Sequence, residues 1–242
     1  MSRALVIEAE RGLCNRLRAV LSYAQVAAAE GRQLLVVWRA DAECNGHFDS
    51  CFAPLAGVRF TTRAPAWDPR PELASCCHPN VGAANEIASF ARLVPIAVIA
   101  ATVAEHVRAL GAFVSVHIRR TDLIAHHGAV FAASGQTTDA LFAAFLDRYA
   151  AHNVHIASCC AQTRGRFRAL YSARLADGVP TIAHDVSGPL RQTSLADAVV
   201  DMYVCAAAEH FLGSRGSSFS DTVDFLRSHN RPERAARAIG AT

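Results

Sequence analysis

Two adjacent arginines near the middle of the chain are the strongest candidates for binding an anion. They stand in segment 117–122, which reads His-Ile-Arg-Arg-Thr-Asp and follows a run of alternating apolar residues. Guanidinium groups bind phosphate through paired, charge-assisted hydrogen bonds. Because neighbouring strand residues point to opposite faces, we expect one of Arg119 and Arg120 to clamp phosphate and the other to pair with Asp122 or a neighbouring group. An ordinary strand end with a solvated Arg-Asp pair would show the same residue types.

A serine-rich turn late in the chain is the second candidate anion site. Residues 213–220 read Gly-Ser-Arg-Gly-Ser-Ser-Phe-Ser, between a short apolar strand and a helix. Hydroxyls and unpaired backbone N–H groups at a helix N-terminus favour a bound anion. Taken alone, Ser217 is equally well explained as a helix N-cap, supported by Asp221 in the first turn. Two such strand ends in one parallel sheet favour phosphate.

The elements that position these residues follow from the pattern of apolar residues. In the first half, a strand at 4–7, a helix at 17–30 and a strand at 33–38 predict a β-α-β unit. Residues 40–85 are expected to be irregular, and 84–110 helical with an interruption near Pro95. The second half alternates as in a parallel sheet. Its strands are expected at 113–118, 154–157, 181–182 and 211–212, and its helices at 138–151, 163–175, 194–208 and 217–227.

The chain of 242 residues is long enough for two small α/β domains, which we expect at 1–111 and 112–242. Its longest nearly uncharged stretch, residues 93–104, is shorter than the roughly 20 residues that a membrane-spanning helix needs. The apolar run at 4–7 is too short for a signal peptide. We therefore expect a cytoplasmic protein or a soluble fragment.

Composition excludes several kinds of chemistry. All 24 basic residues are arginine, which excludes lysine Schiff bases and leaves guanidinium, N–H and hydroxyl groups to bind phosphate. A net charge of +3 is too small to indicate nucleic-acid binding. The eight cysteines lack repeated C-x-x-C spacing, which argues against a structural zinc site. Most fit as buried apolar residues, and Cys44 with Cys51 is the one pair close enough to suspect of bridging.

Three segments together resemble the motifs of the fucosyltransferase superfamily, which includes α1,6-fucosyltransferases, bacterial nodulation fucosyltransferases and protein O-fucosyltransferases. They are 12–17 (Gly-Leu-Cys-Asn-Arg-Leu), 117–122 and 217–220, in the family's order and across almost the whole chain. The resemblance implies a GT-B fold of two Rossmann-like domains with parallel sheets, an acceptor-side domain at 1–111 and a nucleotide-sugar domain at 112–242. It also implies inverting, metal-independent transfer of fucose from GDP-fucose to a glycan or another hydroxyl acceptor, without a cofactor.

The resemblance gives individual residues their expected roles. Arg119 would bind the β-phosphate of the donor, with Arg120 in support. His117 and Asp201 would contact the nucleoside, although Asp201 is otherwise an ordinary carboxylate on a helix face. Asn15 and Arg16 match the loop of the first domain that faces the cleft. The phosphate-binding turn is matched by Ser217, Ser218, Phe219 and Ser220.

The sequence also departs from the family pattern. Cys14 stands where the family has glycine, and residues 157–160 (Ala-Ser-Cys-Cys) replace a Thr-Asp-Asp run. The position of the catalytic glutamate falls at or near His127, whose neutral ring would accept a proton near neutral pH. A solvated loop tip without a role explains His126 and His127 equally well. Asp122 is the other candidate base, weakened by its proximity to the arginines.

Two alternatives to a fucosyltransferase stay open. A nucleotide-sugar-binding protein without transferase activity would account for the missing glutamate and the missing aspartate pair. A transferase that uses another GDP-sugar would keep the phosphate-binding residues and change only the sugar pocket.

Overall fold

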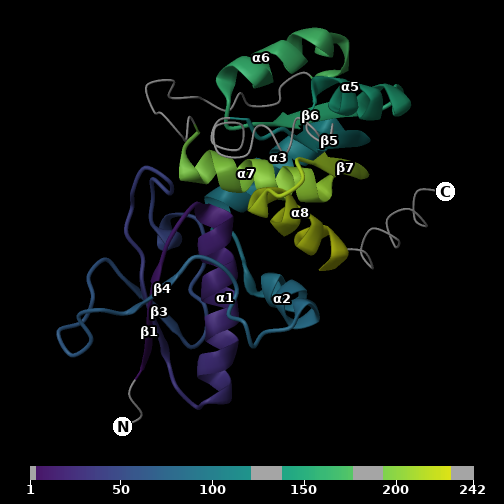
Figure 1. Cartoon of the computed structure of the whole chain (residues 1–242). Helices are drawn as coiled ribbons and strands as arrows, with labels where there is room; N and C mark the ends of the chain where they lie inside the picture. Colours follow the sequence, from purple (N-terminus) through teal and green to yellow (C-terminus); the bar gives the residue numbers. More distant parts are fainter. Residues whose placement is uncertain (1–3, 121–137, 177–192, 230–242) are drawn as a thin grey trace. The chain divides into compact units, whose positions relative to one another are not determined.

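The computed structural model describes residues 4–120, 138–176 and 193–229 (Figure 1). The chain divides into two compact units, Met1–Ile96 with Asp224–Thr242 (unit 1) and Ala97–Val223 (unit 2). Each unit contains one parallel β-sheet. Within the described residues, every helix is too short or too polar to cross a lipid bilayer.

Unit 1 has a four-stranded sheet in the order β3-β2-β1-β4. Helix α1 (Leu13–Ala29) connects β1 to β2 and buries apolar residues such as Leu17 and Leu21. The predicted β-α-β unit is therefore confirmed. The strands are β1 (Leu5–Ala9), β2 (Leu34–Val37), β3 (Val58–Thr61) and β4 (Glu72–Ala74), and the later helices are α2 (Ala83–Ser89) and the 3-10 helices Phe48–Ser50 and Phe90–Arg92.

Residues 40–85 are less irregular than their composition predicts, because they contain β3 and β4. Each residue of β3 pairs with one of β2, and β4 pairs with β1. Strands of three or four residues carry little local signal, and their hydrogen-bonded neighbours decide their conformation. The expectation of a wholly irregular stretch was wrong for this reason.

The described residues of unit 2 form a three-stranded sheet in the order β6-β5-β7. The predicted alternation of strands and helices is confirmed in the described residues, and the expected strand at 181–182 lies outside them. The strands are β5 (Phe113–His117), β6 (Asn153–Ala157) and β7 (His210–Gly213). The helices are α3 (Ala97–Leu110), α5 (Asp139–Arg148), α6 (Ala161–Leu170), the 3-10 helix Ser172–Arg174, α7 (Leu195–Ala207) and α8 (Ser218–His229).

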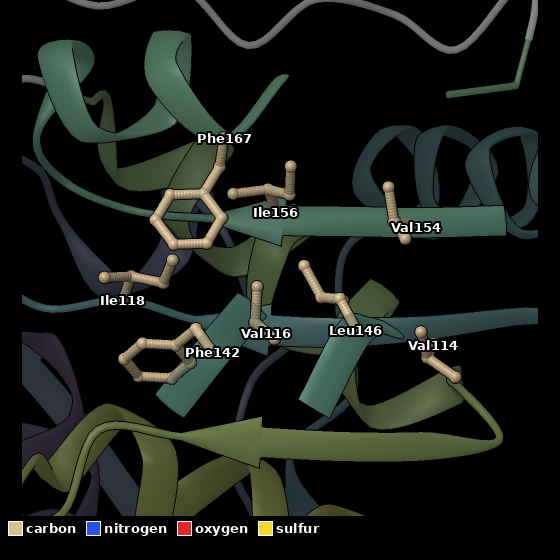
Figure 2. Close-up of a cluster of buried hydrophobic side chains, with 8 residues drawn as sticks. All are labelled: Val114, Val116, Ile118, Phe142, Leu146, Val154, Ile156 and Phe167. Atoms are coloured by element: carbon tan, nitrogen blue, oxygen red, sulfur yellow. The ribbon is translucent and has the colours of Figure 1, made fainter. Parts of the chain in front are cut away.

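The two faces of the unit 2 sheet are covered differently. On one face, α5 and α6 close over a buried apolar cluster (Figure 2) of Val114, Val116, Ile118, Phe142, Leu146, Val154, Ile156 and Phe167. The alternate residues of β5 and β6 face α7: the Ser115 hydroxyl donates to the carbonyl of Cys205, and His155 meets Asp201. Figure 1 shows α3 beside α7, against which it packs. The sheet therefore lies between two layers of helices, as expected for a Rossmann-like unit.

The division between the units differs from the boundary expected after Gly111. Helix α3 belongs to unit 2 because it packs against α7 and buries Ile99 and Leu110. At the other end, residues from Asp224 onward belong to unit 1. There Phe225 contacts Phe90, with ring centroids 5.3 Å apart. Both differences arise from long-range packing, which local pattern does not reveal.

All eight cysteines are free thiols. The suspected bridge between Cys44 and Cys51 is therefore absent. Both of these side chains are buried, as are Cys14 and Cys205. These four fit the expectation that most cysteines pack as small apolar groups.

A charged network is buried in unit 2 around Asp201 of α7. One carboxylate oxygen accepts from Nε2 of His155 on β6 at 3.0 Å, and the other accepts from the Arg164 guanidinium on α6. Burial lowers the pKa of His155 and favours its neutral form. Burial also opposes ionisation of Asp201, but Arg164 and His155 together hold the pKa of that carboxyl below its ordinary value. Asp201 is therefore a buried carboxylate with both oxygens engaged.

We expect Arg164→Gln to destabilise unit 2 by about 3–5 kcal/mol, because removing one partner of a buried ion pair leaves the other charge uncompensated. Arg166 on the same helix is a matched control, since its ion pair with Asp139 is exposed. Arg166→Gln should cost less than about 1 kcal/mol. Denaturant unfolding of the two variants would measure both values. Equal losses would contradict the assignment of a buried network.

Candidate functional site

The two anion-suited segments lie side by side at the carboxyl edge of the unit 2 sheet. His117 of β5 is paired with Gly213 of β7. The backbone N–H of Ser214 donates to the carbonyl of His117 at 3.0 Å. The Ser214 hydroxyl donates to the same carbonyl and accepts from the N–H of Arg119 at 2.9 Å. The structure thus joins segments that are 95 positions apart, at the edge of the sheet where both were expected.

The first turn of α8 packs directly on the end of β5. Nδ1 of His117 lies 2.9 Å from the Ser220 hydroxyl, and the Phe219 ring stacks on the imidazole at 4.2 Å between centroids. This approach requires glycine at position 213, because a Cβ there would lie 2.4 Å from the Cβ of Ser220. His117 is 5% exposed. The structure therefore places His117, Phe219 and Ser220 in one cluster.

Ser217 stands immediately before α8 and is fully buried. Its hydroxyl has no hydrogen-bond partner among the described residues. A buried hydroxyl without a partner is rare in folded proteins. Its position at the positive end of a helix dipole, next to the N–H groups of the first turn, is suited to an anion. Ser218, the first residue of α8, is half-buried.

The two arginines differ in their surroundings. Arg120 donates to Asp139 at 2.6 Å, and its guanidinium lies over the Phe142 ring at 5.9 Å. The prediction that one arginine pairs with a neighbouring group is confirmed for Arg120. This ion pair directs the Arg120 side chain to α5, so the position of the side chain does not require a bound ligand. Arg119 is half-buried, and its main chain is fixed by Ser214 at the end of β7.

Asp201, expected to contact the nucleoside, is 4% exposed and bonded to His155 and Arg164. These bonds give Asp201 a structural role. This agrees in part with the alternative expectation of an ordinary carboxylate on a helix face. Sequence reasoning missed both partners. The only local signals are a histidine inside an apolar strand and an arginine in the first turn of the following helix.

Arg16 holds two loops of unit 1 together. Its guanidinium donates to the carbonyls of Arg11 and Arg39 and to the carboxylate of Asp41, and it lies over Trp38. Its side chain is 1% exposed, so its donors are used inside the unit. These bonds give Arg16 a structural role in unit 1, and its expected contact with the sugar donor stays a prediction.

Asn15, one residue earlier, is half-buried, and its side chain makes no hydrogen bond to the described part of the chain. Both motif residues lie in the first turn of α1 and not in the expected loop, and Asn15 is the one whose side chain stays available. Cys14 occupies an ordinary helical position in α1. The positive φ, 70°, occurs at Arg11 instead, a conformation that is uncommon outside glycine.

Two hollows lie at the carboxyl edge of the unit 1 sheet. The larger, of about 520 Å³, lies after β1 and β2. It is lined by Glu8, Ala9, Glu10, Arg11, Arg39, Ala40, Asp41 and Glu43. The smaller, of about 250 Å³, lies after β2 and β3 and has aromatic walls that include Phe60 and Phe48. Ligands of parallel sheets bind at this edge.

Arg39 pairs with Glu8 in the larger hollow, at 3.3 Å. The backbone N–H of the half-buried Glu10 donates to the carbonyl of Ala74, but its carboxylate has no ion pair or hydrogen bond to the described residues. Because carboxylates outnumber guanidiniums on these walls, the hollow disfavours phosphate and suits a neutral or cationic ligand with many donors.

The candidate bases Asp122 and His127 lie outside the described residues, as does His126. In the parts of the chain that the structure does describe, no three side chains of His, Cys, Asp or Glu gather closely enough to hold a metal ion.

Comparisons with known proteins identify the fold. No family model and no curated protein sequence matches the chain. Several solved structures match the chain in fold. An α1,6-fucosyltransferase, NodZ, in a crystal soaked with GDP-fucose, matches with a TM-score of 0.59 and 16% identity, over 93% of each chain. NodZ from Bradyrhizobium matches with a TM-score of 0.58 and 17% identity, over 93% of this chain and 94% of that one.

POFUT1 in complex with GDP matches with a TM-score of 0.59 and 13% identity, over 94% of this chain and 96% of that chain. The similarity is therefore one of fold over nearly the whole of each protein, at an identity too low to transfer an activity. The chain has the GT-B-like α/β fold of these fucosyltransferases.

Proposed function

We propose that the protein is an inverting glycosyltransferase that moves fucose from GDP-fucose to a hydroxyl of a glycan or another acceptor. The observation that supports this most is the buried Ser217 hydroxyl at the start of α8, which has no partner among the described residues. It lies beside the end of β5 from which Arg119 emerges. The fold adds support, because NodZ and POFUT1 have it and both have structures with GDP or GDP-fucose.

In the proposed reaction, the acceptor oxygen attacks the anomeric carbon of the sugar while the bond from that carbon to the diphosphate breaks. Negative charge grows on the departing diphosphate. Arg119, the Ser217 hydroxyl and the first N–H groups of α8 would stabilise this charge, as fixed donors do in other enzymes. A base removes the proton of the attacking hydroxyl. We propose His127 for this step, with Asp122 as the other candidate.

The proposed acceptor site is the acid-lined hollow of unit 1. A saccharide hydroxyl both donates and accepts hydrogen bonds, so walls that mix carboxylates with guanidiniums suit it. Arg11 and Glu10 supply one group of each kind at the end of β1. The neighbouring aromatic hollow would extend the site along the edge of the sheet.

Two alternative functions stay open, and one series of experiments distinguishes them from fucose transfer. Calorimetry with GDP, UDP, GDP-fucose and GDP-mannose would identify the donor, and a donor-hydrolysis assay would detect turnover. We expect GDP and GDP-fucose to bind and GDP-fucose to be hydrolysed. Binding of GDP-mannose in preference to GDP-fucose would indicate another GDP-sugar. Binding without turnover would indicate a nucleotide-sugar-binding protein.

Arg119→Ala should weaken GDP binding at least about tenfold, since a charged hydrogen bond contributes about 1.5–3 kcal/mol. Arg119→Lys should not restore binding, because an ammonium group lacks the paired donors. Arg120→Ala is the matched control, and its effect on GDP affinity should be smaller because Arg120 pairs with Asp139. Calorimetry would measure all three. Unchanged affinity in Arg119→Ala would exclude it as the phosphate clamp.

Transfer should proceed without a metal ion. No Asp-x-Asp pair stands at a described strand end of unit 2, and guanidinium with a helix N-terminus would take over the role of a divalent cation. Initial rates with excess EDTA should equal those without it. A loss of activity that magnesium or manganese restores would refute this prediction.

Glu10→Gln should raise the acceptor KM about tenfold, equivalent to one charge-assisted hydrogen bond of roughly 1.5 kcal/mol, and leave GDP affinity unchanged. Glu30→Gln removes an exposed carboxylate of the same unit, outside the hollow, and should change neither. Steady-state kinetics in acceptor, combined with GDP calorimetry, would test the pair. An unchanged acceptor KM in Glu10→Gln would move the acceptor site elsewhere.

A further inference from the structure

Two neighbouring thiols form a separate cluster in unit 1. Cys76 and Cys77 follow β4, and their sulfur atoms lie 3.7 Å apart. Cys76 is exposed and Cys77 half-buried. Neither residue belongs to the fucosyltransferase-like motifs or to the hollows described above.

The segment that carries these thiols is fixed on α1. The backbone N–H of His78 donates to the Ser22 hydroxyl at 2.8 Å. The His78 ring packs edge-on against Tyr23, with centroids 4.7 Å apart, and the Tyr23 hydroxyl donates to Glu72 on β4. The chain on both sides of the pair is therefore held against α1.

The spacing of the sulfur atoms matches chelation of one ion. For metal–sulfur bonds of about 2.3 Å, as zinc makes, a separation of 3.7 Å corresponds to an angle at the ion of about 107°, close to tetrahedral. A direct disulfide fits less well. Adjacent Cα atoms are about 3.8 Å apart, below the roughly 4.4–6.8 Å that disulfides usually span.

We propose that Cys76 and Cys77 together bind one thiophilic divalent cation of zinc's size. Two coordination positions are then left for water or for a ligand from outside the chain. This differs from a four-ligand structural zinc site, which the cysteine spacing argues against. The inference is independent of the proposed transferase activity.

The thiol protons make binding depend on pH. Because a cation binds thiolates, it must displace thiol protons, and its affinity should rise as pH rises.

The test uses the reduced, metal-free 242-residue chain. It is titrated with Zn²⁺ against a chromophoric chelator, and with Cd²⁺ to observe the thiolate-to-metal charge-transfer band. We expect one ion per chain. Cys76→Ser and Cys77→Ser should each weaken binding about tenfold or more and reduce the band, because each removes one of two thiolates.

The double variant Cys159→Ser/Cys160→Ser is the matched control, since it removes the other adjacent, partly exposed pair. It should keep the ion, the affinity and the band. The inference is overturned if the wild-type protein shows no band, if Cys76→Ser and Cys77→Ser both keep it, or if the control loses it. Circular dichroism of each variant would confirm that the fold is retained, and GDP calorimetry would report on the donor site separately.

Discussion

The candidate site for the nucleotide sugar depends on the hydroxyl of Ser214, at the end of β7. This hydroxyl donates a hydrogen bond to the carbonyl of His117 and accepts one from the N–H of Arg119. One side chain thus fixes where Arg119 leaves β5 and where the turn before α8 begins. Ser214 is fully buried, so water cannot easily replace these bonds. Gly213 completes the arrangement by letting the first turn of α8 approach the sheet.

The arginines of this lysine-free chain divide by their surroundings. Several stabilise the fold: Arg174 donates to the carbonyls of Leu146, Tyr149 and His152 around the end of α5, where unpaired carbonyls need partners. Arg16 and Arg164 are buried in unit 1 and unit 2, respectively, and each is bonded to an aspartate. Planar guanidinium groups suit such sites because each can satisfy several acceptors at once. A motif arginine is therefore evidence for a ligand only after its internal partners are known.

The pattern of apolar residues was sufficient to predict the helices and strands that local periodicity defines. The strand at β5 and the helices α5, α7 and α8 occur where apolar spacing and N-cap residues predict them, as at Thr138 and Ser194. The placement of both segments at the carboxyl edge of one sheet also followed from the rule for parallel sheets, whereas the pairing of His117 with Gly213 did not. Features created by long-range contacts did not follow from pattern.

Three such features are instructive. β3 is a strand because β2 supplies its hydrogen bonds. α3 belongs to unit 2 because α7 lies against it. Asp201 is held by His155 and Arg164, 46 and 37 positions away, and neither partner is visible from the sequence around Asp201. In each case the deciding group is distant in the sequence.

A crystal structure with GDP bound would test the central claim most directly. We expect the diphosphate at the start of α8, with its oxygen atoms within hydrogen-bonding distance of the Ser217 hydroxyl, the first N–H groups of the helix and the Arg119 guanidinium. The hydroxyl that lacks a partner among the described residues would then acquire one. A diphosphate bound away from α8, with Ser217 still unpartnered, would contradict this account.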